Sequence, residues 1–253
     1  MRITVLQSAE ELGKAAAAKV AQVLRGTIRE KGYARIVVST GASQFTTIEA
    51  LLAEDVDWRK VTLFNLDEYV DLPETHPASF RRYLQERLVN KVPLGRAVLV
   101  DGSKPPREHI SELTALLRAD DIDIGIIGIG ENAHIAFNDP PADFESKDAY
   151  FVSNLTDECK MQQVHEKWFD TIDDVPAQAI TMTCYQIMQC RCIVSPVPYL
   201  SKAQAIKKVL ESDRVSVDIP ATLMTYHKDF HLFLDKDSAS LTDPSLMQEQ
   251  EFV

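Results

Sequence analysis

The chain has 253 residues, 45% of them hydrophobic and 26% charged, and a formal net charge of -11. The apolar content is enough for a sizeable core, and the acidic balance argues against binding nucleic acid through a basic surface. No apolar run is long enough to span a bilayer and the first residues lack the layout of a signal peptide, so we expect a cytoplasmic protein with no membrane partner.

The first third of the chain predicts a helix, a buried strand and a turn suited to anions. Ser8 with Glu11 three residues later forms a capping box, which predicts a long helix ending near Gly32. Residues 35–40 are apolar and β-branched, as in a strand buried on both faces. A small-residue turn and a helix from Thr46 follow, so free backbone N–H groups would favour phosphate, although a plain tight turn is the alternative. The candidate ligands are Thr40, Gly41, Ala42, Ser43 and Gln44.

An acidic pair follows the second predicted strand, which covers residues 61–65. Asp67 and Glu68 would be solvated in an ordinary loop, but a position just past a buried strand favours a role in a binding site. A helix is expected to begin near Ser79. Arg81 and Arg82 fall on its first turn, where pairing with nearby acids is the simplest interpretation.

The stretch with the most chemistry lies in the middle of the chain. Residues 122–128 predict a buried strand that ends in a turn at Gly128 and Gly130. Proton-handling and hydrogen-bonding side chains follow directly. They are Glu131, Asn132, His134, Asn138 and Asp139. Because ligands of open α/β sheets bind outside the carboxyl ends of the strands, we expect an active site here.

The second half continues the alternation of strands and helices. Short strands are predicted at 98–100, 150–155, 192–197 and 230–234, with helices at 107–118 and 156–169. The polar residues of the 156–169 helix could cover the site as a lid spanning about 143–172, or simply form a solvated face. Lys202 falls in the first turn of another helix, where the macrodipole disfavours a cation, and this hints at a bound anion.

Alternating strands and helices predict an α/β fold with a mostly parallel, open, Rossmann-like sheet and helices on both faces. No linker or repeat divides the sequence, so we expect a single domain over residues 1–253. The cysteines at 159, 184, 190 and 192 lack zinc-site spacing and are interpreted as buried thiols, so no metal is expected.

Four stretches occur together and in a fixed order: Thr40-Gly41-Ala42-Ser43, FNLDEYV at 64–70, HPASF at 76–80 and GIGENAHIAFNDP at 128–140. In this order and spacing the chain resembles the glucosamine-6-phosphate deaminase/isomerase family, which belongs to a wider group with the 6-phosphogluconolactonases. The Asn138-Asp139-Pro140 ending favours the deaminase branch. The resemblance covers nearly the whole chain and implies the fold of that family.

The resemblance implies a cofactor-free reaction in which an amino-sugar 6-phosphate, D-glucosamine 6-phosphate first of all, gives fructose 6-phosphate and ammonia. Asp67 matches the base that moves a proton between C1 and C2, and His134 matches the ring-opening acid/base, supported by Asn132 and Asp139. Ser43 and its turn, Lys160 and Lys202 fall where the family holds the phosphate. Glu68 and Gly130 complete the expected substrate-binding set. The only partner implied is a small sugar phosphate, with assembly into a homo-oligomer left open.

Three positions depart from the family pattern. Ala133 replaces a glycine and could narrow the sugar pocket or alter the turn. Asp139 is one methylene shorter than the usual Glu. Lys160 replaces an Arg, so it would contact the phosphate as a point charge and not through two parallel hydrogen bonds. Two alternatives to the deaminase stay open. One is a lactonase of the 6-phosphogluconolactonase type, and the other is a sugar-phosphate-sensing domain without catalysis.

Overall fold

The computed structural model describes residues 1–247, and its main element is a seven-stranded, fully parallel sheet. The strand order is β1 (Arg2–Leu6), β10 (Phe230–Asp235), β9 (Cys192–Val197), β6 (Ile124–Ile126), β2 (Ala34–Val38), β3 (Val61–Asn65) and β5 (Arg96–Val98). The predicted α/β fold with a mostly parallel sheet is confirmed.

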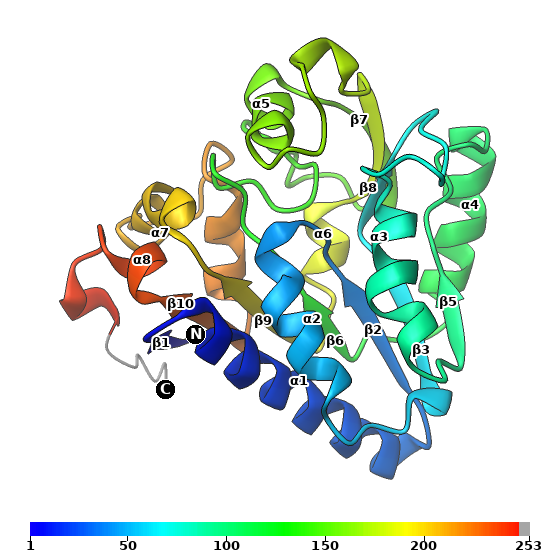
Figure 1. Cartoon of the computed structure of the whole chain (residues 1–253), viewed down its shortest axis with the longest axis horizontal. Helices are drawn as coiled ribbons and strands as arrows, with labels where there is room; N and C mark the ends of the chain where they lie inside the picture. Colours follow the sequence, from blue (N-terminus) through cyan, green and yellow to red (C-terminus); the bar gives the residue numbers. More distant parts are fainter. Residues whose placement is uncertain (248–253) are drawn as a thin grey trace.

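Helices cover both faces of this sheet, and each face has its own apolar core. One core contains residues of α1 (Ala9–Lys31), α2 (Phe45–Leu52) and α3 (Phe80–Arg87). The other contains residues of α4 (Pro106–Leu117), α6 (Cys184–Ile187) and α7 (Ala203–Leu210). Figure 1 shows α1 and α2 lying together across one face. The short 3-10 helices are Ala42–Gln44, Trp58–Lys60, Val89–Lys91, Ile172–Asp174, Leu200–Lys202, Pro220–Tyr226 and Pro244–Met247.

The strands are buried on both sides because successive side chains point to opposite faces. In β2, Ile36 and Val38 pack into the core beneath α1, while Val37 between them packs into the other core beside Phe64. This explains why the sequence of a central strand is an unbroken apolar run, as the sequence analysis assumed.

The cap positions of α1 agree with the prediction from sequence, but the capping box is only half formed, because the Glu11 carboxylate accepts from the Gln7 N–H at 3.2 Å and not from that of Ser8. The Ser8 hydroxyl accepts a hydrogen bond from the Glu11 N–H at 3.3 Å and so begins the helix. At the other end Gly32 adopts a left-handed φ of 84°, and its N–H donates to the Ile28 carbonyl. Only glycine takes this conformation without strain, so the helix ends at Lys31.

A second, three-stranded antiparallel sheet was not predicted. Its order is β4 (Asp67–Tyr69), β8 (Gln178–Met182) and β7 (Tyr150–Asn154), and it lies beside α5 (Asp157–His165) at the top of Figure 1. The sequence analysis treated residues 67–69 as loop, which is wrong. A three-residue strand is too short to show a period, and its partner at Thr181 is distant in sequence. As a consequence, Asp67 belongs to a paired strand.

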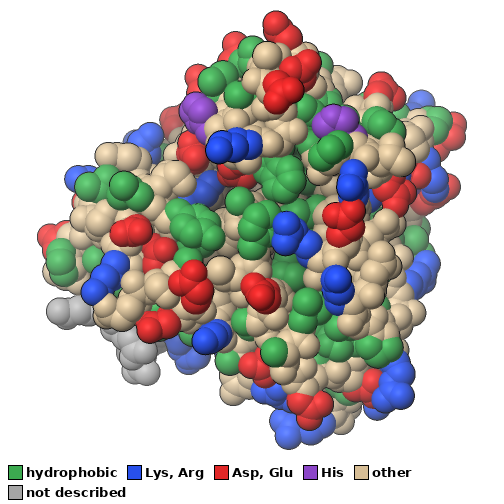
Figure 2. Space-filling model, viewed as in Figure 1, with side chains coloured by type: hydrophobic (Ala, Val, Ile, Leu, Met, Phe, Trp, Pro, Cys, Tyr) green, Lys and Arg blue, Asp and Glu red, His purple; other side chains and the backbone are tan. Residues whose placement is uncertain are grey.

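Several smaller features complete the fold. The helix α5 is shorter than the predicted 156–169, and α8 (Lys236–Ala239) follows β10 and contacts α7. All four cysteines are buried free thiols, as expected. No helix within residues 1–247 is long and apolar enough to cross a membrane. On the face seen in Figure 2, acidic and basic side chains are interspersed and do not gather into a basic surface. The assignment of the whole chain to one domain stays a prediction.

Candidate active site

A pocket opens at the carboxyl edge of the parallel sheet where β2 and β6 lie side by side. From β2 the chain continues to β3 and β5 on one side, whereas β6 leads to β9 and β10 on the other. The loops after such neighbouring strands separate and leave a crevice. The lining residues are Ser39, Thr40, Gly41, Ser43, Leu66, Asp67, Phe80, Gly128, Ile129, Gly130, His134, Ala136, Phe137, Gln162, Gln163, Glu166 and Lys202.

The turn after β2 forms one wall of this pocket. At the edge of the sheet, the N–H of Gly128, which follows β6, donates to the hydroxyl of Ser39, which follows β2, at 3.1 Å. This hydrogen bond links the two loops that border the pocket. Gly41 has a φ of 104°, a conformation that other residues rarely adopt. Thr40, Gly41 and Ser43 line the pocket as predicted, while Ala42 and Gln44 do not. Gln44 instead supports the wall, because its amide donates to the Ser43 hydroxyl at 3.1 Å and to the Pro196 carbonyl at 3.3 Å.

Asp67 enters the pocket from the junction between β3 and β4. Its backbone is fixed by the buried Asn65, whose amide donates to the Asp67 carbonyl at 2.7 Å and whose oxygen accepts from the Val100 N–H at 2.8 Å. Burial, and to a smaller degree the negative charge of Glu68, raise the pKa of Asp67 well above its ordinary value. A carboxylate with a raised pKa is a stronger base, which suits proton abstraction from carbon.

Glu68 points away from the pocket. Its carboxylate accepts hydrogen bonds from the Ser79 hydroxyl at 2.7 Å and from the Arg81 N–H at 2.9 Å, and it forms an ion pair with the Arg81 guanidinium at 3.3 Å. The predicted contact of Glu68 with substrate is therefore corrected, since adjacent residues of a strand face opposite sides. Arg81 also pairs with Asp101, and Arg82 pairs with Glu86 at 2.8 Å, so both arginines meet acids as expected.

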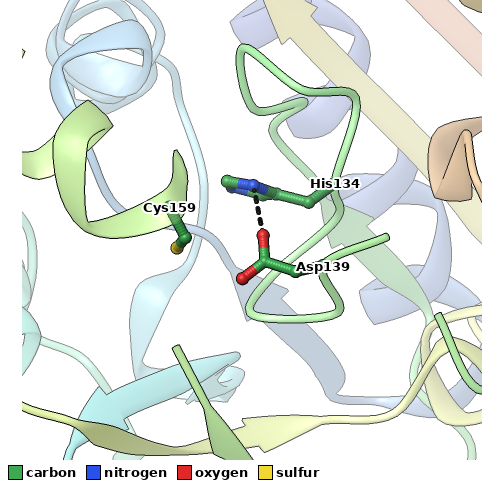
Figure 3. Close-up of side chains that lie close together, drawn as sticks. All are labelled: His134, Asp139 and Cys159. Carbon is green, nitrogen blue, oxygen red and sulfur yellow. Dashed lines mark ion pairs between the residues drawn. The ribbon is translucent and has the colours of Figure 1, made fainter. Parts of the chain in front are cut away.

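His134, which lines the pocket, pairs with Asp139 behind it in the same loop (Figure 3). His134 Nδ1 and Asp139 Oδ1 are 3.1 Å apart, so the shorter carboxylate reaches the ring. The Asn132 amide donates to the same oxygen at 3.2 Å, and the Asn132 oxygen accepts from the His134 N–H at 3.1 Å. Burial alone would raise the pKa of Asp139, but contacts with His134, Asn132 and Cys159 outweigh it and lower the pKa below the usual range. Asp139 is thus an ionised partner that orients the imidazole.

The glycine at 130 is required by this imidazole. A methyl group built on Gly130 would lie 2.3 Å from ring atoms of His134. Ala133, by contrast, has a left-handed φ of 69°, is buried in the core and does not line the pocket. Of the two effects expected of Ala133, narrowing of the pocket is not seen, whereas the left-handed φ agrees with the alternative that the residue alters the turn. The alanine that lines the pocket is Ala136, whose φ is 50°.

Helix α5 covers the pocket through two buried glutamines. The Gln162 oxygen accepts from the Glu131 N–H at 2.9 Å, and the Gln163 oxygen accepts from the Tyr69 hydroxyl at 2.9 Å. Both glutamines line the pocket, whereas Lys160 and His165 do not. Lys160 therefore lies outside the pocket lining, and its contact with phosphate stays a prediction. The segment 143–172 thus contributes lining residues to the pocket, and its role as a lid stays a prediction.

Lys202 enters the pocket from the short helix Leu200–Lys202, which precedes α7. Only 4% of the residue is exposed, and its Nζ lies 3.6 Å from Oε1 of Glu166. The sequence analysis predicted Lys202 but missed Glu166, although Glu166 lies within the segment interpreted as a lid. No local pattern identifies it, because its contact with Lys202 depends on tertiary packing.

Two groups of side chains in residues 1–247 have the composition of a metal site. His134, Asp139 and Cys159 offer ligand atoms within 4.8 Å of one another, as do Cys192, Asp229 and His231. Burial raises the pKa of both thiols, which disfavours the thiolate that a metal requires. In the first group, His134 and Asp139 also pair with each other, which suits acid–base chemistry.

The chain is similar to one known family and to several of its members. Residues 7–233 match the family described as glucosamine-6-phosphate isomerases/6-phosphogluconolactonase. A glucosamine-6-phosphate deaminase of Exiguobacterium sibiricum is 36% identical over 95% of this chain and 93% of its own, and one of Lactobacillus delbrueckii is 31% identical over 95% and 99%. The solved structure of a monomeric glucosamine-6-phosphate deaminase matches with a TM-score of 0.87 and 30% identity, covering 95% of this chain and all of that one. A 6-phosphogluconolactonase structure from Neisseria gonorrhoeae matches with a TM-score of 0.73 and 22% identity over 93% and 99% of the two chains, and shares the fold.

Proposed function

This chain belongs to the glucosamine-6-phosphate isomerase/6-phosphogluconolactonase family, and we propose that it is a deaminase that converts D-glucosamine 6-phosphate and water to fructose 6-phosphate and ammonia. One observation carries the proposal: a desolvated carboxylate, an imidazole with an ionised partner and a buried lysine line the same pocket. The relatives at 30% identity or more that support it are named glucosamine-6-phosphate deaminase.

Opening the pyranose ring is the step we assign to His134. The C1 hydroxyl must lose a proton and the ring oxygen must gain one, and an imidazole can carry out both transfers near neutral pH. Asp139 holds Nδ1, so Nε2 is the nitrogen free to face the sugar. The product of this step is the open-chain aldehyde with the amine still on C2.

Moving the proton between two carbons is the step we assign to Asp67. Its carboxylate removes the proton from C2, which is acidic because it lies next to the C1 aldehyde, and leaves an amino-enol. Return of the proton to C1 gives an imine at C2, and addition of water with loss of ammonia gives the ketose. The raised pKa of Asp67 supports this role, because general base catalysis is most effective when the pKa of the base lies near the working pH.

The phosphate would be held at the other end of the pocket by Lys202 and by the turn of Thr40, Gly41 and Ser43. Backbone N–H groups at such a turn favour anions, and a buried lysine adds a charge. Binding there would fix the sugar without touching the reacting carbons, so that binding energy is used for orientation.

An ammonia-release assay tests the proposal. Purified protein is incubated with the 6-phosphates of glucosamine, galactosamine and mannosamine, and with 6-phosphogluconolactone as the competing substrate. We expect ammonia and fructose 6-phosphate in equal amounts from glucosamine 6-phosphate. Lactone hydrolysis without ammonia release would identify the lactonase instead. Binding of the sugar phosphates without turnover of any of them would identify a sensing domain.

A further inference from the structure

The end of the pocket that contains Lys202 also contains a carboxylate, that of Glu166. One of its oxygens, Oε1, lies 3.6 Å from the Lys202 Nζ. The other, Oε2, would lie 3.7 Å from a methyl group built on Gly41. The carboxylate therefore sits between the lysine and the turn after β2, which is the place where the proposed function requires the phosphate of the substrate.

Glu166 is supported by neighbours from its own segment. The Gln162 amide donates to Oε1 at 2.8 Å, and the Trp168 indole N–H donates to Oε2 at 3.2 Å. The link to the rest of the pocket is the ion pair with Lys202. Within residues 1–247, Lys202 pairs with no other acid. The contact thus joins the segment that covers the pocket to the one lysine that lines it.

The charges of the lining residues do not suit a phosphate while this pair is closed. The lining contains the carboxylates of Asp67 and Glu166 and the single ammonium group of Lys202. A phosphate monoester carries nearly two negative charges at neutral pH, and like charges at close range in a desolvated site repel each other strongly.

We propose that Glu166 competes with the phosphate group of the substrate for Lys202 and so determines the affinity of this end of the pocket. In the empty enzyme the carboxylate holds Lys202, and the sugar phosphate displaces it on binding. The inference rests on the proposed sugar-phosphate function. Because the phosphate does not react, the competition weakens substrate binding and leaves the chemical step unchanged.

The test compares Glu166→Gln with the matched control Glu158→Gln, which removes an exposed acid from the same covering helix. Binding of inorganic phosphate is measured by calorimetry, and KM and kcat are measured with glucosamine 6-phosphate. For Glu166→Gln we expect phosphate to bind about tenfold more tightly, KM to fall by a similar factor, and kcat to stay within about twofold. Glu158→Gln should match the wild type in each measurement.

A second background separates competition from a merely structural role. In Lys202→Gln the cation for which Glu166 and the phosphate compete is gone, so adding Glu166→Gln should tighten phosphate binding much less than it does in the wild-type background. An equal gain in both backgrounds, or weaker phosphate binding in Glu166→Gln itself, would overturn the inference. Glu166→Ala is expected to act in the same direction and serves if the glutamine variant does not fold. If the wild type releases no ammonia from any hexosamine phosphate, the proposed function fails, while the phosphate titrations still decide the role of Glu166.

Discussion

The carboxylates of Asp139 and Glu166 each pair with a nitrogen-containing side chain that lines the pocket, His134 and Lys202 respectively. The two pairs are built in different ways. Asp139 and His134 belong to a single turn, and Asn132 from the same turn bonds to both of them at 3.1–3.2 Å. Glu166 and Lys202 come from separate elements and are 3.6 Å apart, with supporting hydrogen bonds on the Glu166 side.

This difference indicates what each end of the pocket is suited to. A pair fixed within one turn keeps its geometry whether or not a ligand is bound, as general acid–base catalysis requires. A pair that joins two separate elements can open without breaking either one, as exchange for a ligand requires. We therefore interpret the His134 end as preorganised and the Lys202 end as exchangeable.

The strongest test of the preorganised end is Asp67→Asn. The amide keeps the size of the carboxylate but cannot take a proton from carbon, so we expect kcat to fall by about 10³-fold or more while KM changes little. Steady-state kinetics with glucosamine 6-phosphate would check this. Turnover near that of the wild type would remove Asp67 from the role of base.

Asp139→Asn probes the fixed pair itself. Loss of the charge beside His134 Nδ1 removes the partner that orients the ring, and we expect kcat to fall by about 10²-fold. Asp139→Glu is the conservative variant, and it should retain most of the activity if the negative charge is what matters. The pH profile of kcat should change in Asp139→Asn as well, whereas a purely structural loss would lower activity equally at every pH.

Much of this pocket could be predicted from sequence because parallel strands end at a common edge. The apolar runs of β2, β3 and β6 were recognisable, and Ser43, Asp67 and His134 follow them directly. Lys202 was recognised because a lysine in a first helical turn is unfavourable without an anion.

The rest of the site depends on contacts between elements that are distant in sequence. The strand β4 has only three residues and is defined by its pairing with β8, so no periodicity reveals it. Glu68 was assigned to the substrate because the alternation of strand faces was not visible without that pairing. Glu166 and Lys202 meet through tertiary packing, and Ala133 faces the core because of the turn, which a comparison of residue types does not show.

Lys202→Gln probes the exchangeable end. We expect KM for glucosamine 6-phosphate to rise by about tenfold or more, with kcat less affected, because in the proposed function the lysine holds the phosphate, which does not react. An exposed lysine on the neighbouring helix, changed in Lys208→Gln, is the control for the loss of one positive charge. A large fall in kcat without a change in KM would place Lys202 at the reacting end and contradict the distinction between the two ends.

The smallest effect we predict concerns stability, and it follows from the burial of Asp67. The pKa of Asp67 is raised in the folded protein by burial and by Glu68, so as pH rises the unfolded chain loses this proton first. Between the unfolded and the folded pKa the folded state binds more protons, and the free energy of unfolding falls with rising pH until the folded pKa is passed. Asp67→Asn lacks this group and should be more stable than the wild type above that window, and about equally stable below the unfolded pKa.

The difference can be measured by urea unfolding at several pH values, since one pKa unit corresponds to about 1.4 kcal/mol. The control is Asp213→Asn, which changes an exposed aspartate. If the free energy of unfolding has the same pH dependence in Asp67→Asn and in the wild type, the ionised carboxylate of Asp67 is not destabilising. That result would weaken its interpretation as a base whose pKa is raised by burial.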